Sequence, residues 1–349
     1  MKIASFFSGA GGLDLGFTNM GFEIVFANDN WEGCWETFEK NHCIPINKKS
    51  IVDISSNEIP DVIGFIGGPP CQSWSLAGAM KGINDPRGKL FYNYINLIRE
   101  KKPLFFLAEN VAGILSPKHK LEFIKIIQAF QEIGYNVSFK LLDAKYYNVP
   151  QERQRVIIVG YHKKLGKEFE FPSANIRLIT LKEAIGDLPT PISAKEKNKT
   201  NQNLSIPNHE YMNGGFSTIY MSRNRVRSWD EQSFTIQAGG RHAPIHPQAP
   251  KMKFIEQNKR EFVKGKEHLY RRLSVRECAR IQTFPNDFIF YYKDVADGYK
   301  MIGNAVPVKF AETIAKKIMQ DLREIQEKSN IKILQMKSQK SKEAELCSM

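Results

Sequence analysis

Cys71 stands in a setting that is unusual for a structural cysteine. It follows two glycines and two prolines in "GFIGGPPCQSWS" (64–75), just past an apolar run. The prolines fix the backbone φ angle and the glycines allow a sharp turn, so this loop can hold a thiol in one position. A free cysteine is more often a small buried residue. Burial is unfavourable in a polar loop, so the pattern predicts a nucleophile that attacks as a thiolate.

Glu109 and the arginines of "QERQRVIIVG" (151–160) are the next reactive candidates. Glu109 ends an apolar run, where a buried carboxyl group is costly unless it has a partner. In a dry pocket such a group can donate a proton at neutral pH. Gln151, Arg153 and Arg155 alternate, so on a strand they share one face and could direct donors at a carbonyl oxygen or a phosphate. An edge strand that displays charge is the alternative.

A glycine-rich turn and two aspartates outline a nucleotide site. The turn lies between an apolar run and a helical segment in "FFSGAGGLDLGF", and three of its glycines let the backbone approach a ligand: Gly9, Gly11 and Gly12. Asp29, at the end of the second strand, is placed to hold a pair of ribose hydroxyls. Asp53, expected after the third strand, could accept from an adenine amino group. Either aspartate alone could equally be a turn residue or a helix cap.

Asn304 and Val306 precede a helical segment in "GNAVPVKFAETIAKKI". An asparagine followed by a proline in the first turn is acceptable as simple capping. The pair could also hold the amino-acid end of a ligand.

The elements that must position these groups alternate between strands and helices. Apolar runs predict buried strands at 2–7, 22–27, 62–67 and 103–109, with a closing pair at 135–144 and 153–162. Helical spacing occurs between them at 31–42, 89–100 and 120–134. This alternation predicts an α/β fold with a doubly wound, mostly parallel, Rossmann-like sheet.

The rhythm changes after about residue 170, which predicts four parts. A catalytic and cofactor-binding domain spans 1–170, and a smaller irregular domain spans 171–270. Helical segments at 274–284 and 307–328 form a return (271–328) that completes the first domain. The polar tail, 329–349, is expected to be frayed.

The charge is concentrated in one part of the chain. Residues 1–150 carry 15 basic and 15 acidic side chains, so the whole net charge of +13 arises after residue 150. A basic excess of this kind indicates a surface for a polyanion, although solvated lysines are an equally good explanation of charge alone. The arginine-rich segment "SRNRVRSW" (222–229) favours nucleic acid, because arginine suits phosphates and guanine edges.

Five irregularly spaced cysteines without a CxxC pair predict a reducing cytoplasm and neither a disulfide framework nor a metal site. No apolar run approaches the roughly 20 residues needed to span a bilayer, so no membrane association is expected. The amino-terminal segment lacks the pattern of a signal peptide.

Six blocks of the sequence resemble, in order, the DNA cytosine-5 methyltransferases. They are "FSGAGGLDLGF", "GGPPCQSWS", "LAENV", "QERQRV", "RRLSVRECARIQTFP" and "GNAVP", and the resemblance covers about residues 1–165 and 270–325. It implies a Rossmann-like sheet with a small target-recognition domain, S-adenosylmethionine as the cofactor and double-stranded DNA as the substrate. It also implies catalytic roles for four residues: Cys71, Glu109, Arg153 and Arg155.

In that family the thiolate adds to C6 of a flipped-out cytosine, the glutamate donates a proton to N3, and C5 takes the methyl group. The resemblance implies that Arg155, with help from Arg153, holds the O2 carbonyl. Many members have an aromatic residue directly after the acidic residue that holds the ribose. Here Asn30 follows that acidic residue, and Trp31, one place later, is expected to point elsewhere. Phe7 and its apolar neighbours are therefore expected to pack on the adenine ring.

Residues 208–250 resemble the recognition segment of the GGCC-specific members, which methylate the internal cytosine. Arg225, Arg227 and Arg241 are the predicted contacts to guanines or phosphates. The resemblance implies a monomeric modification enzyme in the cytoplasm of a bacterium, protecting DNA from a partner restriction endonuclease.

Three other functions fit part of the pattern. A nicotinamide-dependent oxidoreductase would use the glycine-rich turn and Asp29, but it leaves Cys71, "LAENV" and "QERQR" without a role. A non-catalytic DNA-binding protein would account for the basic region alone. An RNA cytosine-5 methyltransferase would use the same chemistry on a different substrate.

Overall fold

A central six-stranded sheet organises the first half of the chain. The structure is a computed structural model that describes residues 1–70 and 88–346, with the backbone alone at 88–89 and 329–346. The strands are β1 (Lys2–Phe6), β2 (Glu23–Asn28), β3 (Gly64–Gly67), β4 (Phe105–Val111), β5 (Tyr135–Asp143) and β6 (Gln154–His162). Their order is β2-β1-β3-β4-β6-β5, and β6 runs antiparallel to both of its neighbours while the others are mutually parallel. The predicted doubly wound, mostly parallel fold is confirmed.

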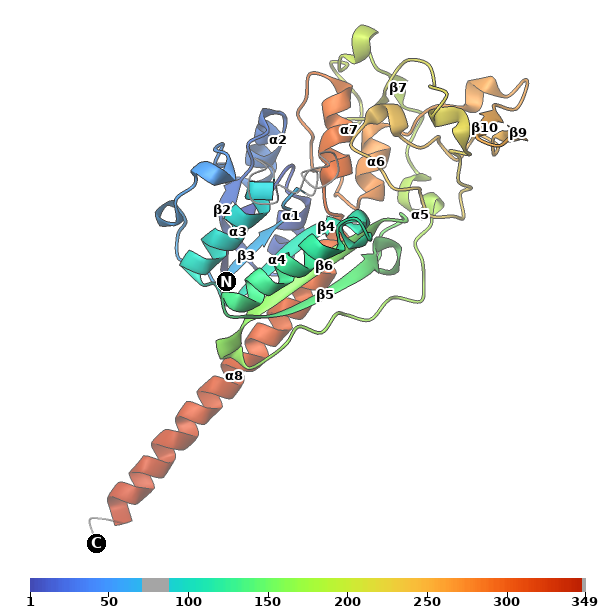
Figure 1. Ribbon diagram of the computed structural model, residues 1–349. Helices are drawn as coiled ribbons and strands as arrows, with labels where there is room; N and C mark the ends of the chain where they lie inside the picture. Colours follow the sequence, from blue (N-terminus) through green and yellow to red (C-terminus); the bar gives the residue numbers. More distant parts are fainter. Residues whose placement is uncertain (71–87, 347–349) are drawn as a thin grey trace.

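Helices cover both faces of the sheet because alternate strand residues are apolar on both sides. Ile3, Phe105 and Leu107 face a core that includes residues of α1 (Gly12–Asn19) and α8 (Val308–Leu346). Their strand neighbours Ala4, Phe106 and Ala108 face a second core. That core includes residues of α3 (Gly88–Lys101) and α4 (Lys120–Glu132), while α2 (Glu32–His42) follows β2. The result is the three-layer arrangement in Figure 1.

The carboxyl-terminal helix closes this domain by packing directly on the first helix. A side chain at Gly16 of α1 would place its Cβ 2.4 Å from the Cβ of Ala311 in α8, so the two backbones can approach only because Gly16 has none. Among the side chains of α8 that the structure describes, which end at residue 328, the last buried one is that of Leu322. The second half of α8 extends away from the rest of the described chain (Figure 1).

Short elements form the remaining part of the molecule. They are α5 (Leu181–Ile185), β7 (Ile192–Ser193), β8 (Glu210–Tyr211), β9 (Lys253–Glu256), β10 (Lys259–Glu261), α6 (Val275–Ile281) and α7 (Val295–Asn304). Single 3-10 turns connect many elements: η1 (Ile51–Asp53), η2 (Ser56–Glu58), η4 (Ala112–Leu115), η5 (Ala144–Tyr146), η6 (Lys163–Leu165), η7 (Glu196–Asn198), η8 (Tyr220–Ser222), η9 (Gly240–His242) and η10 (Glu267–Leu269). Figure 1 shows α6 and α7 between the sheet and the small strands. A core shared by α5, α6 and α7 joins this part to the first domain through Ala10 and Cys34.

Helix α7 was not predicted, because its sequence "VADGYKMIGN" contains two glycines that lower helix propensity. Close packing explains both glycines. A Cβ at Gly298 would lie 2.7 Å from the ring of Tyr292, and one at Gly303 would lie 2.3 Å from the backbone of Gln237. Asn304 is consequently the last residue of α7 rather than part of a loop.

Three local expectations are wrong. Asp53 lies in η1, before β3 rather than after the third strand. Gln151 and Arg153 precede β6, so they do not share a strand face with Arg155. Residues 329–346 of the tail that was expected to fray continue α8 instead, and they contain no proline or glycine that would end a helix. None of the helices in the described part of the chain could cross a bilayer.

Candidate active site

A cavity of about 560 Å³ opens at the carboxyl ends of β1, β2, β3 and β4. Ligands of open α/β sheets bind at this edge, where the loops leave the strands. The cavity brings together most of the residues that the sequence predicts for cofactor binding or proton transfer: Phe7, Gly9, Gly12, Asp29, Glu109, Asn304 and Val306. Asp53 is exposed and does not line it, so the expected contact to an adenine amino group has no support in this geometry.

Asp29 fixes the glycine-rich turn. Its two carboxylate oxygens accept hydrogen bonds from the backbone N–H of Gly9 and of Trp31, each at 2.8 Å. Burial raises the pKa of Asp29, and these two N–H groups oppose the rise. A carboxylate has about four acceptor positions, so Asp29 keeps capacity for a ligand hydroxyl.

The glycines of this turn are required by close contacts. The backbone φ angle of Gly11 is +83°, and a Cβ there would meet the imidazole of His42 at 2.0 Å. A Cβ at Gly12 would lie 2.4 Å from the carbonyl oxygen of Val306. Gly11 therefore caps α1 from outside the cavity lining, whereas Gly12 brings α1 against the "GNAVP" segment.

Trp31 lines the cavity, contrary to the expectation that it points elsewhere. The Nζ atom of Lys300, which also lines the cavity, lies 3.8 Å from the centre of the indole ring. The missing side chain of Gly33 makes room for the ring, because a Cβ there would lie 2.4 Å from it. An aromatic surface is thus present even though Asn30, which directly follows Asp29, is not aromatic.

Glu109 and Arg155 meet at the wall of the cavity. They lie on the paired strands β4 and β6, and the Nε of Arg155 is 2.7 Å from Oε1 of Glu109. That oxygen accepts no hydrogen bond among the described residues, so the contact is an ion pair in which the N–H is not aimed at the oxygen. The neighbouring Asn110 donates through Nδ2 to the carbonyl of Pro69 at 2.9 Å. Cys71 follows Pro70, which lines the same cavity, but Cys71 itself lies outside the described residues.

Arg153 does not join Arg155, and this corrects the expectation that both hold one carbonyl oxygen of the substrate. Its side chain is buried, with 1% of the residue exposed. Nη1 donates to the carbonyl of Ile236 at 3.0 Å, and Nη2 donates to those of Gly303 and Ala305 at 2.9 Å each. Arg153 therefore ties the smaller domain (171–270), called the recognition region below, to the "GNAVP" segment.

The charged residues of the cavity suit a polar, partly cationic ligand. Among the described residues, the buried carboxylate oxygens that accept no hydrogen bond belong to Asp14 and Glu109, and both residues line the cavity. Buried polar atoms normally have partners, so these atoms fit a cavity that binds a ligand. The described residues bring no three metal-ligating side chains together. The sequence analysis missed Asp14 and Lys300; the signal for Asp14 was a carboxylate inside the apolar run of "GGLDLGF".

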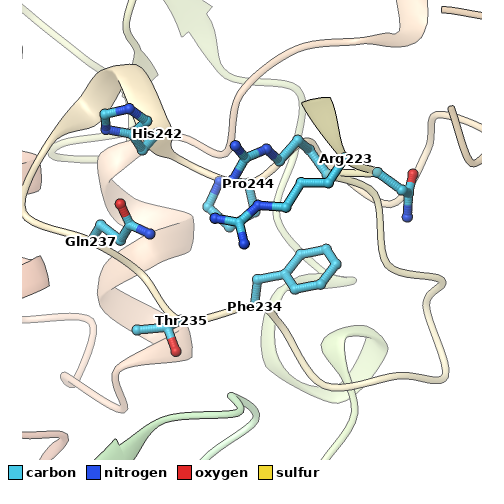
Figure 2. Close-up of a pocket in the computed structure, with 8 residues that line it drawn as sticks. Arg223, Phe234, Thr235, Gln237, His242 and Pro244 are labelled. Atoms are coloured by element: carbon cyan, nitrogen blue, oxygen red, sulfur yellow. The ribbon is translucent and has the colours of Figure 1, made fainter. Parts of the chain in front are cut away.

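Two further hollows lead from this cavity to the recognition region. One is lined by Lys145, Gln154 and Arg155, and it shares Val111 with the cavity. A pocket of about 200 Å³ adjoins it and shares Thr235. Figure 2 shows Gln237 and His242 on one side of this pocket, with Arg223 and Phe234 on the other.

The recognition arginines differ in what they contact. Arg225 is 8% exposed and donates to the carbonyls of Tyr220 and Ile219. Arg227 forms ion pairs with Glu152 and Glu231. Arg241, in η9, and Arg223 are exposed and form no ion pair with a described residue. Arg223, which lies in the same arginine-rich segment, was not singled out from the sequence.

Comparison with known proteins identifies the family. The family of C-5 cytosine-specific DNA methylases matches residues 1–320, which is most of the chain. The chain belongs to this family. As a family member it is a C-5 cytosine DNA methyltransferase of the restriction-modification type.

Its relatives among the C-5 cytosine methylases are similar over nearly their whole length. The type II methyltransferase M.MthTI of Methanothermobacter thermautotrophicus is 67% identical over 323 residues, which are 92% of this chain and 98% of that protein. M.FnuDI of Fusobacterium nucleatum is 54% identical over 327 residues, which are 92% of this chain and 95% of that protein. The solved structure of the Entamoeba histolytica methyltransferase EhMeth shares the fold, with a TM-score of 0.67, 18% identity and coverage of 92% of this chain and 98% of that one.

Proposed function

We propose that this methyltransferase transfers a methyl group from S-adenosylmethionine to C5 of a flipped-out cytosine in double-stranded DNA. The observation that carries the proposal is the Glu109–Arg155 pair at the wall of a cavity that the "GGPP" turn also lines. An acid, a guanidinium and the residue before the predicted nucleophile thus adjoin one ligand-sized cavity.

The residues at the glycine-rich end of the cavity would hold the cofactor. Asp29 is placed for the ribose hydroxyls, and Phe7 and Trp31 supply aromatic surface for the adenine ring. Asn304 and Val306 line the same cavity and are placed for the amino-acid part of the cofactor. S-adenosylmethionine, when bound, supplies an electrophilic methyl group.

The chain's own residues would activate the cytosine. The Cys71 thiolate forms a bond to C6, and Glu109 donates a proton to N3 as negative charge develops on the ring. Arg155 orients Glu109 and donates to O2. C5 then carries the electron pair that takes the methyl group, and the methyl–sulfur bond breaks to leave a neutral thioether. Loss of the C5 proton expels the thiolate, N3 returns its proton to Glu109, and the aromatic ring is restored.

DNA would reach this site along the hollows that connect it to the recognition region. A cytosine inside a duplex cannot approach a buried acid, so the base must leave the stack. The cavity shares Val111 with a neighbouring hollow, and that hollow shares Thr235 with the pocket in Figure 2, so the three adjoin one another. Lys145 lines the hollow between them, where it pairs with Asp143 and Glu152, so a phosphate would compete with these carboxylates for it.

Covalent trapping tests the chemistry. Duplex DNA containing 5-fluorocytosine should form a stable adduct after methylation, because fluorine at C5 cannot leave as a proton does. Cys71→Ser should abolish the adduct, whereas Cys43→Ser, which changes an exposed cysteine, should not. An adduct that survives Cys71→Ser would refute the nucleophile. Absence of methyl transfer to any DNA would favour a non-catalytic DNA-binding protein, and faster transfer to tRNA would favour an RNA enzyme.

We also propose GGCC as the recognition sequence, with the internal cytosine methylated. Arg223 and Arg241 are exposed, so they are available for a guanine edge or a phosphate. Arg225 supports the pocket through two backbone carbonyls, and Arg227 reaches DNA only if it leaves its carboxylate partners.

Bisulfite sequencing of DNA from cells expressing the protein tests this specificity. Arg223→Ala should weaken the free energy of binding to GGCC-containing DNA by about 1–3 kcal/mol, and should relax the choice of base at one position, if Arg223 reads a guanine. Uniform weakening on all sequences would assign it to a phosphate. Arg260→Ala is the matched control, since Arg260 is a recognition-region arginine stacked on Phe254 away from the pocket.

The biological setting we propose is protection of a bacterial genome, in the cytoplasm, by a monomer paired with a restriction endonuclease. Plasmid recovered from expressing cells should resist an endonuclease that cuts GGCC. Light scattering of the free protein should give a mass near 40 kDa.

A further inference from the structure

Asp14 is a buried carboxylate that the proposed chemistry does not use. It lies in the first turn of α1, is fully buried and lines the cofactor cavity. Neither carboxylate oxygen accepts a hydrogen bond from a described residue. Its own backbone N–H and the hydroxyls of Ser5 and Ser8 lie close enough to lower the pKa of Asp14, but none of them meets hydrogen-bond geometry with a carboxylate oxygen. A buried carboxylate without partners is costly, so a partner is expected from outside the chain.

We propose that the Asp14 carboxylate binds the α-ammonium group at the amino-acid end of S-adenosylmethionine. The inference rests on the proposed function, because it assigns a residue to the same cofactor. It adds a residue that fixes one end of the ligand and selects for a positive charge there.

The charges of the ligand's two ends favour the amino-acid end for Asp14. Asp14 lines the same cavity as Asn304 and Val306. Asp29, whose charge lies nearby, is already bonded to the backbone N–H of Gly9. The nucleoside end offers uncharged hydroxyl and amino groups, whereas the amino-acid end carries an ammonium cation, which is the partner that a buried carboxylate lacks.

Electrostatics agree with a cationic partner. Burial raises the pKa of Asp14 to about 7, and the nearby charge of Asp29 adds to the rise. The hydroxyls of Ser5 and Ser8 oppose it; their bond to each other at 2.9 Å uses one of their two protons, and neither hydroxyl reaches hydrogen-bond geometry with a carboxylate oxygen. The other charged residues that line the cavity are Asp29, Glu109 and Lys300. An ammonium group at Asp14 would replace the missing stabilisation of the charged form.

Calorimetric binding of two cofactor fragments tests the assignment without a turnover assay. S-adenosylhomocysteine carries the ammonium group but has a neutral sulfur, and 5′-methylthioadenosine lacks the whole amino-acid part. Asp14→Asn keeps the shape of the side chain and removes its charge. It should weaken the binding of S-adenosylhomocysteine by about 10–100-fold. The affinity for 5′-methylthioadenosine should stay within about twofold of that of the unmodified protein. Asp61→Asn, an exposed aspartate away from the cavity, should change neither.

A pH comparison on the unmodified protein supplies the same test if the variant does not fold. Between pH 7.5 and 5.5, protonation of Asp14 should weaken S-adenosylhomocysteine by about 20-fold. Titration of Asp29 would affect the nucleoside part, which both ligands share. It would therefore change both affinities equally, and the ratio of the affinity for S-adenosylhomocysteine to that for 5′-methylthioadenosine isolates the effect of Asp14.

The outcomes separate the two proposals. Wild-type affinity of Asp14→Asn for S-adenosylhomocysteine overturns the ammonium assignment, and so does an equal loss for both ligands, which would indicate a structural role. Weaker binding of S-adenosylmethionine with unchanged binding of S-adenosylhomocysteine would assign Asp14 to the sulfonium group, and this result would also overturn the ammonium assignment. Failure of the unmodified protein to bind either ligand would instead contradict the proposed function.

Discussion

Arg153 joins three parts of the chain, and replacing it by methionine should destabilise the protein strongly. The side chain of methionine fills much of the same space but donates no hydrogen bond. Arg153→Met would remove the donors that now reach the carbonyls of Ile236, Gly303 and Ala305. These carbonyls lie 83, 150 and 152 residues further along the chain.

The size of the effect follows from these contacts. A hydrogen bond from a charged donor contributes roughly 1.5–3 kcal/mol, so three of them amount to about 5–9 kcal/mol before the cost of burying the guanidinium is subtracted. That cost is real, because burial lowers the pKa of Arg153 well below its ordinary value. The carbonyl of Ala305 keeps a second donor, the Nε2 of Gln282 at 3.4 Å. The carbonyls of Ile236 and Gly303 are left with no side-chain donor, and the net loss in the free energy of unfolding should be about 3–5 kcal/mol.

Urea unfolding followed by circular dichroism measures this loss, with Arg155→Met as the matched control. Arg155 forms a single, largely buried ion pair with Glu109 at the cavity wall, so its replacement should cost about 1–3 kcal/mol in stability, less than Arg153→Met, while abolishing methyl transfer. Arg153→Met should instead lose more stability than Arg155→Met. It should also bind S-adenosylhomocysteine more weakly, because Asn304 lies between Gly303 and Ala305, whose carbonyls Arg153 holds. Unchanged stability of Arg153→Met together with lost methyl transfer would refute this reasoning and return Arg153 to the substrate.

Three other predictions follow from single contacts. Gly303→Ala should cost about 1–3 kcal/mol in urea unfolding, because its Cβ would lie 2.3 Å from the backbone of Gln237; an unchanged midpoint would contradict that packing. Burial lowers the pKa of His42 and His246 to about 4, so histidine-selective NMR should show both rings neutral from pH 8 to 5.5 in the folded protein. The unfolded chain takes up these protons near pH 6.5, so both histidines destabilise the folded state as the pH falls from about 6.5 toward 4. A titration midpoint near 6.5 for either ring in the folded protein would contradict this prediction. A chain ending at residue 328 should melt at the same temperature as the full chain, because the last buried side chain among those described in α8 is that of Leu322 and the helix beyond it extends away from the rest of the described chain; a lower melting temperature in calorimetry would contradict this.

Local pattern was sufficient to predict the sheet and the cofactor turn. Buried strands such as β4 are apolar on both faces, so they stand out as short continuous runs. The glycines of the turn are needed by the backbone itself, and this requirement is visible at their own positions. The β4 residue Glu109 and the β6 residue Arg155 were found in the same way, because a polar group at the end of an apolar run is conspicuous.

Contacts between distant segments decided the rest. The side chains of Arg153 and Arg155 have the same chemistry and stand two residues apart, yet one binds carbonyls up to 152 residues away and the other faces the cavity. The two glycines of α7 weaken a helix in isolation and become favourable only when Tyr292 and Gln237 lie against them. Asp14 is an ordinary first-turn acid by sequence, and only the folded chain leaves its oxygens buried without donors. A sequence determines which groups a chain carries and its local backbone preferences. Which partner each group meets depends on the three-dimensional packing of segments that are far apart along the chain.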